Sequence, residues 1–192
     1  IQFVNQPEDP ASLSQNTVQA LFEDRQGRLW IGTAGGLNLL NEQDLSFRNY
    51  RSLEDDPASL SLDSVLSIFE DRWGRFWVGT AGGGLNLMDR ESGQFTSFVN
   101  DPDQADTISN DHVFSIFEDR SGMLWFGTFG GGVSNYDPYK VKFLHVRAQS
   151  NTAAGLSVNT IWAIYQDQQQ SLWVGTHGGG MNRLLEEEGT WS

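Results

Sequence analysis

The sequence contains no cysteine, which excludes disulfide bonds, thiol catalysis and thiolate metal sites. Basic residues are scarce as well, with 12 Lys and Arg against 25 Asp and Glu and a net charge of −13. That charge argues against nucleic acid and anionic membrane surfaces as partners, because both require basic patches. No apolar run approaches the roughly 18 residues that a membrane-spanning helix needs, so no membrane span is expected in this chain.

Proline is also infrequent, with 5 residues, whereas glycine and tryptophan number 21 and 7 in a chain of 192 residues. This combination is typical of many short strands joined by turns, and it argues against disorder. No segment carries an apolar stripe at helical spacing that is long enough for a helix.

The dominant feature is an internal repeat of 48 residues. A segment of an apolar residue, Trp, an apolar residue, Gly and Thr occurs four times, and its tryptophans are 47, 48 and 48 residues apart. These tryptophans are Trp30, Trp77, Trp125 and Trp173. An aspartate stands six residues before each of them, namely Asp24, Asp71, Asp119 and Asp167. Four copies fill the chain, so we predict one repeat region over residues 1–192.

Each repeat is predicted to form four strands, for example residues 18–22, 29–31 and 37–40 of the first repeat and 95–98 of the second. A four-stranded antiparallel meander of about 40 to 50 residues with one Trp per copy is typical of a β-propeller blade. We therefore predict an all-β fold of four such blades, with the first strand of each blade innermost.

The second strand of each repeat is apolar on both faces, which suits a sheet packed between two neighbouring blades. We expect the four tryptophans in the interblade core and regard a carbohydrate-stacking role for them as the weaker alternative. Gly32 is expected to leave space for an aromatic ring of the adjacent blade.

The repeat resembles that of the two-component regulator propellers, in which a strand ending in Glu-Asp precedes Asp-x-x-Gly-x-Leu-Trp-Ile-Gly-Thr and Gly-Gly-Leu-Asn. The first copy carries this pattern from Glu23 to Asn38. The fourth copy departs from it, because Gln166 replaces the Glu and Gln170 stands where the other copies have Gly, so that turn should be strained or rebuilt. The resemblance implies a periplasmic sensor region ahead of a histidine kinase or diguanylate cyclase module.

Two sets of residues suggest a ligand site. One position varies inside the frame Gly-Thr-x-Gly-Gly, and the first strand of each repeat is preceded by Asn or Asp. The meander places both sets on the same face, near the central channel. The candidate ligand-binding residues are Asn16, Asp63, Asp111, Asn159, Phe129 and His177. The alternative, favoured for each Asn or Asp taken alone, is that these side chains cap the turn before the strand.

No catalytic residue, metal ligand or cofactor is predicted. The Asp-x-x-Gly segments lack the Asp-x-Asp-x-Asp-Gly pattern of calcium loops, so hairpin turns are favoured. The histidines are His112, His145 and His177, and the only carboxylate beside one of them is Asp111, which cannot point the same way as His112 on a strand. A further resemblance, to a propeller lyase acting on cyclic depsipeptide antibiotics, keeps an enzyme open as an alternative.

The resemblance favours a non-catalytic sensor of carbohydrate or a related small molecule, and an interaction scaffold for other proteins remains the alternative.

The chain ends suggest an assembly. Trp191 aligns with the start of a fourth strand and Phe3 with the end of one, so the outermost strand is expected to be divided between the two termini. Family members resemble seven-bladed rings, and an open arc of four blades leaves apolar faces exposed. We favour a homodimer that closes an eight-bladed ring over a four-bladed monomer and over a fragment of a longer ring.

Overall fold

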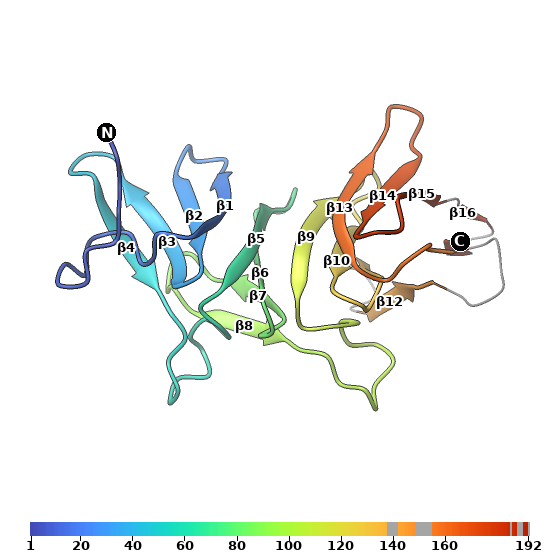
Figure 1. Cartoon of the computed structure of the whole chain (residues 1–192), viewed down its shortest axis with the longest axis horizontal. Helices are drawn as coiled ribbons and strands as arrows, with labels where there is room; N and C mark the ends of the chain where they lie inside the picture. Colours follow the sequence, from blue (N-terminus) through green and yellow to red (C-terminus); the bar gives the residue numbers. More distant parts are fainter. Residues whose placement is uncertain (138–141, 149–154, 185, 188–189, 192) are drawn as a thin grey trace. The chain divides into compact units, whose positions relative to one another are not determined.

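The computed structural model describes residues 1–137, 142–148, 155–184, 186–187 and 190–191, and within these ranges it contains strands and turns but no helix. The prediction of an all-β fold is therefore confirmed. The chain divides into two compact units, Ile1–Ser97 and Phe98–Ser192, which run from blue to green and from green to red in Figure 1. Nothing in the described ranges is a helix that could cross a membrane.

The first unit contains two four-stranded sheets whose strands follow one another in sequence order, as a meander requires. The strands of the first sheet are β1 (Val18–Glu23), β2 (Leu29–Thr33), β3 (Gly36–Asn41) and β4 (Ser46–Tyr50). Those of the second sheet are β5 (Val65–Glu70), β6 (Phe76–Thr80), β7 (Leu85–Met88) and β8 (Phe95–Phe98). Strand β5 contacts both β1 and β2, so the two sheets pack as neighbouring blades.

The second unit contains a third four-stranded sheet and a shorter fourth one. The third sheet comprises β9 (Val113–Glu118), β10 (Leu124–Thr128), β11 (Val133–Asp137) and β12 (Lys142–Val146). The fourth comprises β13 (Ile161–Gln166), β14 (Leu172–Thr176) and β15 (Met181–Leu184), and a separate pair is formed by β16 (Glu186–Glu187) and β17 (Thr190–Trp191). Strand β13 contacts β9 and β10, as β5 contacts β1 and β2.

The expected division of an outermost strand between the termini is not observed. Phe3 lies outside any strand, and Trp191 pairs with Glu186 instead of extending the fourth sheet. The physical reason is that a fourth strand needs a third strand beside it, and Phe3 has none in the first unit. Its ring nevertheless packs edge-on against Phe47 at 5.4 Å.

Two tryptophans of the second strands, Trp30 and Trp125, lie in the interblade core, as predicted for all four. Trp30 is 1% exposed, and its ring centroid lies 4.6 Å from that of Phe76 in the next blade. Trp125 is fully buried in a cluster that includes Leu172 of the fourth blade. Trp173 is only half-buried. Burial of the first three rings excludes them as exposed stacking platforms.

The expectation that Gly32 makes room for an aromatic ring is wrong. A Cβ on Gly32 would lie 2.7 Å from Cγ1 of Val65, and one on Gly127 would lie 2.7 Å from Cγ2 of Ile161. The occupant is thus the β-branched residue that begins the next blade's inner strand. The aromatic ring of the next blade, Phe76, packs against Trp30 instead.

Each aspartate of the Asp-x-x-Gly turns holds the tryptophan six residues later. The four Asp Oδ2 atoms accept hydrogen bonds from the Trp Nε1 atoms of their own blades at 2.8, 3.0, 2.8 and 2.8 Å. In the first blade, Asp24 Oδ1 also accepts from the backbone N–H groups of Gln26 and Arg28. One carboxylate therefore closes the β1–β2 turn and fixes the orientation of the interblade ring.

The turn of the fourth blade keeps this geometry despite its changed sequence. Gln170 adopts a φ of 69°, the left-handed region that glycine occupies in the other blades, and its N–H donates to the Asp167 carbonyl at 3.1 Å. The predicted strain is therefore confirmed, since a side chain is disfavoured there.

We expect Trp30→Ala to lower the free energy of unfolding by about 3–5 kcal/mol, because it leaves a cavity and deprives the buried Asp24 of a donor. Trp173→Ala should cost clearly less, because that ring is only half-buried. Urea denaturation of both variants measures the difference, and equal losses would contradict the assignment of Trp30 to an interblade core.

Gln170→Gly should raise the free energy of unfolding by about 1 kcal/mol, because glycine occupies a positive φ without steric cost. Gln169→Gly is the control, since that residue is exposed in the same turn and has no positive φ. A stabilisation by Gln169→Gly, or none by Gln170→Gly, would show that the turn is not strained.

Candidate functional site

The Asn and Asp residues that precede the inner strands share one structural role. The Oδ1 atom of each accepts a hydrogen bond from the backbone N–H located 11 residues earlier, at 2.6 to 2.7 Å. The pairs are Asn16 with Asn5, Asp63 with Ser52, Asp111 with Asn100, and Asn159 with Ala148. These side chains close the polar loop that enters each blade, which favours the capping interpretation for their Oδ1 atoms.

The varied position of the glycine frame lies beside these residues, as the meander predicts. The N–H of Phe129 donates to the His112 carbonyl at 3.1 Å, and the N–H of His177 donates to the Thr160 carbonyl at 2.9 Å. Phe129 is 52% exposed and His177 is also exposed. Because His112 follows Asp111 and Thr160 follows Asn159, the two predicted sets meet at the same end of each blade.

Two aromatic side chains that were not predicted complete this cluster. Trp162, which is 58% exposed, stacks on His177 with ring centroids 4.8 Å apart and planes inclined by 30°. Phe114 packs edge-on against Phe129 at 6.2 Å, and His112 lies 5.9 Å from the same ring. The same pairing of two repeat positions thus occurs in the third and the fourth blade.

A β-bulge explains how these side chains reach that end of the blade. The register shifts between Ile161 and Ala163, so Trp162 is the extra residue of β13. A bulge adds one unpaired residue and re-aims its side chain. The equivalent shift in β9 places Phe114 in the same way. We call Phe114, Phe129, Trp162 and His177 the aromatic cluster.

The first unit has the same framework without the rings. Its bulges carry Gln19 and Leu66, and its glycine frames carry Ala34 and Ala81. Asn16 and Asp63 therefore stand beside small or flexible side chains, whereas Asp111 and Asn159 stand beside the aromatic cluster. The sequence signal for Phe114 and Trp162 was the change from Gln19 and Leu66 to aromatic residues at this repeat position, which a comparison of the four repeats would have revealed.

The histidines are engaged in packing. His112 and His177 lie against Phe129 and Trp162, as described. His145 is partly buried, with Nδ1 3.2 Å from the Ser134 hydroxyl. Burial and, to a smaller extent, the charge of Arg147 lower the pKa of His145. Within the part of the chain that the structure describes, no three His, Asp or Glu side chains gather to hold a metal.

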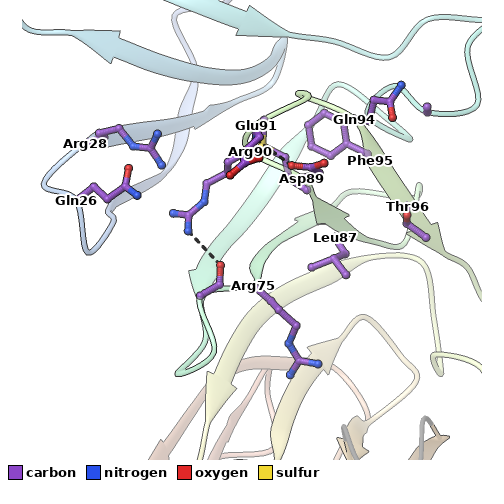
Figure 2. Close-up of a pocket in the computed structure, with 13 residues that line it drawn as sticks. Gln26, Arg28, Arg75, Leu87, Asp89, Arg90, Glu91, Gln94, Phe95 and Thr96 are labelled. Atoms are coloured by element: carbon purple, nitrogen blue, oxygen red, sulfur yellow. Dashed lines mark hydrogen bonds between the residues drawn. The ribbon is translucent and has the colours of Figure 1, made fainter.

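A large cavity of about 750 Å³ lies in the first unit, at the end of the blades where the Asp-x-x-Gly turns lie (Figure 2). Arg90 reaches across it and donates to the Gly74 carbonyl at 3.0 Å, to Glu70 at 2.7 Å and to Asp24 at 3.1 Å. Arg28 and Arg75 pair with the turn aspartates of their own blades. Arg90 of the second blade thus serves the contact with Asp24 of the first blade, whereas Arg28 and Arg75 are paired within their own blades.

The Asp24 carboxylate is electrostatically stabilised. Burial raises its pKa, but hydrogen bonds from Arg28, Trp30 and the turn backbone outweigh that effect and lower the pKa from 3.8 to about 2. A hydrogen bond from Trp173 likewise lowers the pKa of Asp167. Because its oxygens are committed to the turn, to tryptophan and to arginine, Asp24 acts as a structural group.

Comparison with known families and structures agrees with this architecture. The model of the two component regulator propeller family matches residues 12–35, 59–82, 107–130 and 155–178. A comparison with curated proteins gave no match.

Three solved structures are informative. The extracellular domain of the hybrid two component system BT3049 from B. thetaiotaomicron has a TM-score of 0.78 and 23% identity, over 98% of this chain and 25% of that chain. The corresponding domain of BT4673 has a TM-score of 0.74 and 21% identity, over 96% of this chain and 25% of that chain. Virginiamycin B lyase from Staphylococcus aureus has a TM-score of 0.61 and 14% identity, over 97% of this chain and 60% of that chain. These likenesses establish the propeller fold, and the chain spans about a quarter of the first two chains.

The lowered pKa of Asp24 predicts a pH-dependent stability. The carboxylate stabilises the folded state fully above pH 3.8, and this contribution, about 2 kcal/mol, is lost as the pH falls through about 2. We expect Asp24→Asn to be less stable at neutral pH and to lose less stability than the wild type between those pH values. Urea titrations at a series of pH values test this, with the exposed Asp55→Asn as control. Parallel profiles for Asp24→Asn and the wild type would contradict it.

Proposed function

Because the chain belongs to the two component regulator propeller family, we propose that it is a non-catalytic ligand-sensing region of an extracytoplasmic signalling receptor. The observation that carries the proposal is the aromatic cluster, which exposes flat side chains at the ends of two adjacent blades. Its rings stand at two repeat positions, the bulge residue and the varied residue of the glycine frame, whose side chains are small or flexible in the first unit and aromatic in the second. Ligand recognition explains this change better than folding does, because the first unit forms its blades without these rings.

Carbohydrate or a related small molecule is the ligand class that we propose. Trp and Phe faces pack against the apolar faces of a ligand, and a few polar groups beside them fix its orientation. Asp111 and Asn159 can supply such groups, since only their Oδ1 atoms are committed to loop closure. Asn16 and Asp63 retain one uncommitted polar atom each at the equivalent positions of the first unit, and they remain proposed ligand contacts.

The placement outside the cytoplasm is supported by the two Bacteroides structures, which are extracellular domains of two component systems. In the proposed receptor, ligand occupancy biases a downstream signalling module by favouring one of its conformations. The packing of His112 and His177 against aromatic rings supports recognition over acid–base catalysis. The lyase structure shares the propeller fold at 14% identity.

A second candidate function is protein docking, which the exposure of Phe129 and Trp162 also favours, since aromatic residues are enriched in protein interfaces. The two candidate functions differ in the kind of molecule that binds the aromatic cluster. A small sugar should bind it directly in the first case, and only a folded partner should do so in the second.

We expect Trp162→Ala to weaken binding of a responsive sugar at least tenfold, about 1.4 kcal/mol, because it removes the largest stacking face of the cluster. The measurement is calorimetric titration of the purified chain with a panel of neutral oligosaccharides. Trp73→Ala is the matched control, since Trp73 is an exposed tryptophan, 45% accessible, at the hairpin-turn end of a blade. Binding that survives Trp162→Ala, or a panel in which no sugar binds, would contradict the proposed site.

A further inference from the structure

The third blade carries a distinctive pair of residues that face each other across β11 and β12. Ser134 pairs in register with His145, whereas Asn38 pairs with Asn49 at the same positions of the first blade. The second and fourth blades also have Asn at the position of Ser134. The third blade thus replaces a pair of amides by a hydroxyl and a titratable imidazole.

In the first blade the amide pair anchors the loop that enters the blade. Nδ2 of Asn49 donates to the carbonyls of Pro10 and Ser12 at 2.9 and 3.0 Å. Oδ1 of Asn38 accepts from the Ser14 N–H at 2.8 Å. Because an amide does not titrate, the contacts of this loop are independent of pH.

The equivalent loop of the third blade, residues 100–111, is anchored by the imidazole. The Ala105 carbonyl, which corresponds to a carbonyl held by the amide of the first blade, hydrogen-bonds to the ring of His145. Nδ1 of the same ring lies 3.2 Å from Oγ of Ser134, and that Oγ accepts from the Ser109 N–H at 3.0 Å. The anchor of this loop can therefore gain or lose a proton.

Ser134 connects the imidazole to two further hydroxyl groups. Its Oγ lies 2.7 Å from Oγ of Ser109, which in turn lies 3.1 Å from Oγ1 of Thr128. Thr128 Oγ1 also lies 2.9 Å from the Gly132 carbonyl, to which it can donate. A continuous chain of three hydroxyls thus leads from the imidazole to Gly132.

The direction of this chain depends on the charge of His145. When the neutral ring donates to the loop carbonyl with one nitrogen, its Nδ1 is an acceptor, so the hydroxyls donate toward it from Thr128 through Ser109 and Ser134. The imidazolium has an N–H group at both nitrogens, so Nδ1 donates and the hydroxyls turn toward the Gly132 carbonyl. Protonation of one ring therefore reverses every hydrogen bond of the chain.

The chain ends beneath the loop that carries Phe129 of the aromatic cluster, and we call residues 129–132 the glycine loop. A Cβ on Gly131 would lie 2.7 Å from Oγ1 of Thr128 and 2.8 Å from Oγ of Ser109. The glycine loop thus rests directly on two of the three hydroxyls, and a change in their direction acts on it.

The charged groups around His145 come from its own strand and from the loop that enters the blade. Burial and, to a smaller extent, the charge of Arg147 lower the pKa of His145, and the hydrogen-bonded loop carbonyl opposes them. Nε of Arg147 also donates to the Gly131 carbonyl at 3.3 Å. β11 faces the ring with the neutral Ser134, and the glycine loop has no charged residue. The carboxylates of the entering loop are those of Asp101, Asp103 and Asp106.

We propose that His145 is a proton-sensitive positioning residue that acts through the hydroxyl chain on the glycine loop. The neutral ring keeps this loop in the conformation described. The imidazolium loosens it, because it reverses the hydroxyls and repels Arg147, which holds the Gly131 carbonyl. The inference rests on the proposed function only in that Phe129 of this loop belongs to the ligand site, whose affinity for a ligand then falls in acid.

The lowered pKa of His145 sets the sign of this pH dependence. The loop keeps its full stability above pH 6.5, the ordinary pKa of histidine, because the ring is then neutral in the folded and the unfolded chain. That stability is lost as the pH falls through the lower pKa of the folded chain.

Titration of the wild type by nuclear magnetic resonance from about pH 8 to about pH 5 tests the coupling without any ligand. We expect the His145 ring to titrate with a midpoint below 6.5 and the backbone amide signals of Ser109 and Thr128 to shift with the same midpoint. These amides are suitable reporters, since the first donates to Ser134 Oγ and the second to the Gly132 carbonyl.

The double variant His145→Asn, Ser134→Asn introduces the amide pair of the first blade, so the blade should fold and these amide shifts should be lost. His112→Asn is the matched control, because His112 is the other histidine of this blade and lies 5.9 Å from Phe129 without joining the hydroxyl chain. It should leave the amide shifts of the wild type unchanged.

Two outcomes would overturn the proposal. One is a wild type in which the Ser109 and Thr128 amides do not move while His145 titrates. The other is a double variant in which they still move with the wild-type midpoint. Because this titration uses no ligand, its failure is distinct from that of the proposed function, which the absence of sugar binding would reveal.

Discussion

The hydrogen bond from each Trp Nε1 to the aspartate six residues earlier is the interaction on which the blades depend. It joins the turn of the inner hairpin to the ring that packs between blades. One carboxylate therefore fixes both the conformation of the turn and the orientation of the ring. A buried indole N–H needs an acceptor, and a buried carboxylate needs donors. The pair satisfies both requirements, which explains why Asp and Trp keep their spacing in all four repeats.

The glycine after each tryptophan imposes the second constraint. It gives the next blade's first β-branched residue a place close to the sheet, and any side chain there would collide with it in the first and third blades. Sequence periodicity could predict that space was needed at Gly32, because glycine in a buried strand usually marks a close approach. It could not predict that Val65 would fill it and that Phe76 would lie on Trp30, since that depends on how two blades are staggered.

The limits of the sequence are clearest at the two ends and at the bulges. The strands, the turns and the interblade tryptophans followed from the repeat, because each depends on contacts that recur every 48 residues. Phe3 packs on Phe47 as Tyr50 packs on Phe95, which agrees with their alignment, but a strand also requires a partner strand, which an alignment does not supply. Trp162 and Phe114 escaped notice because a bulge reverses the simple alternation of side chains along a strand.

A repeat protein of this kind separates folding from recognition by position. Asp, Trp, Gly and Thr recur in every copy and make the contacts within and between blades, so a substitution there weakens the blade itself. The bulge residue and the variable residue of the glycine frame contact each other across the first two strands without entering the interblade core. They can therefore change from Gln19 and Ala34 to Trp162 and His177 without altering the blade. Where the copies differ while the blade persists, the side chains are available for a ligand.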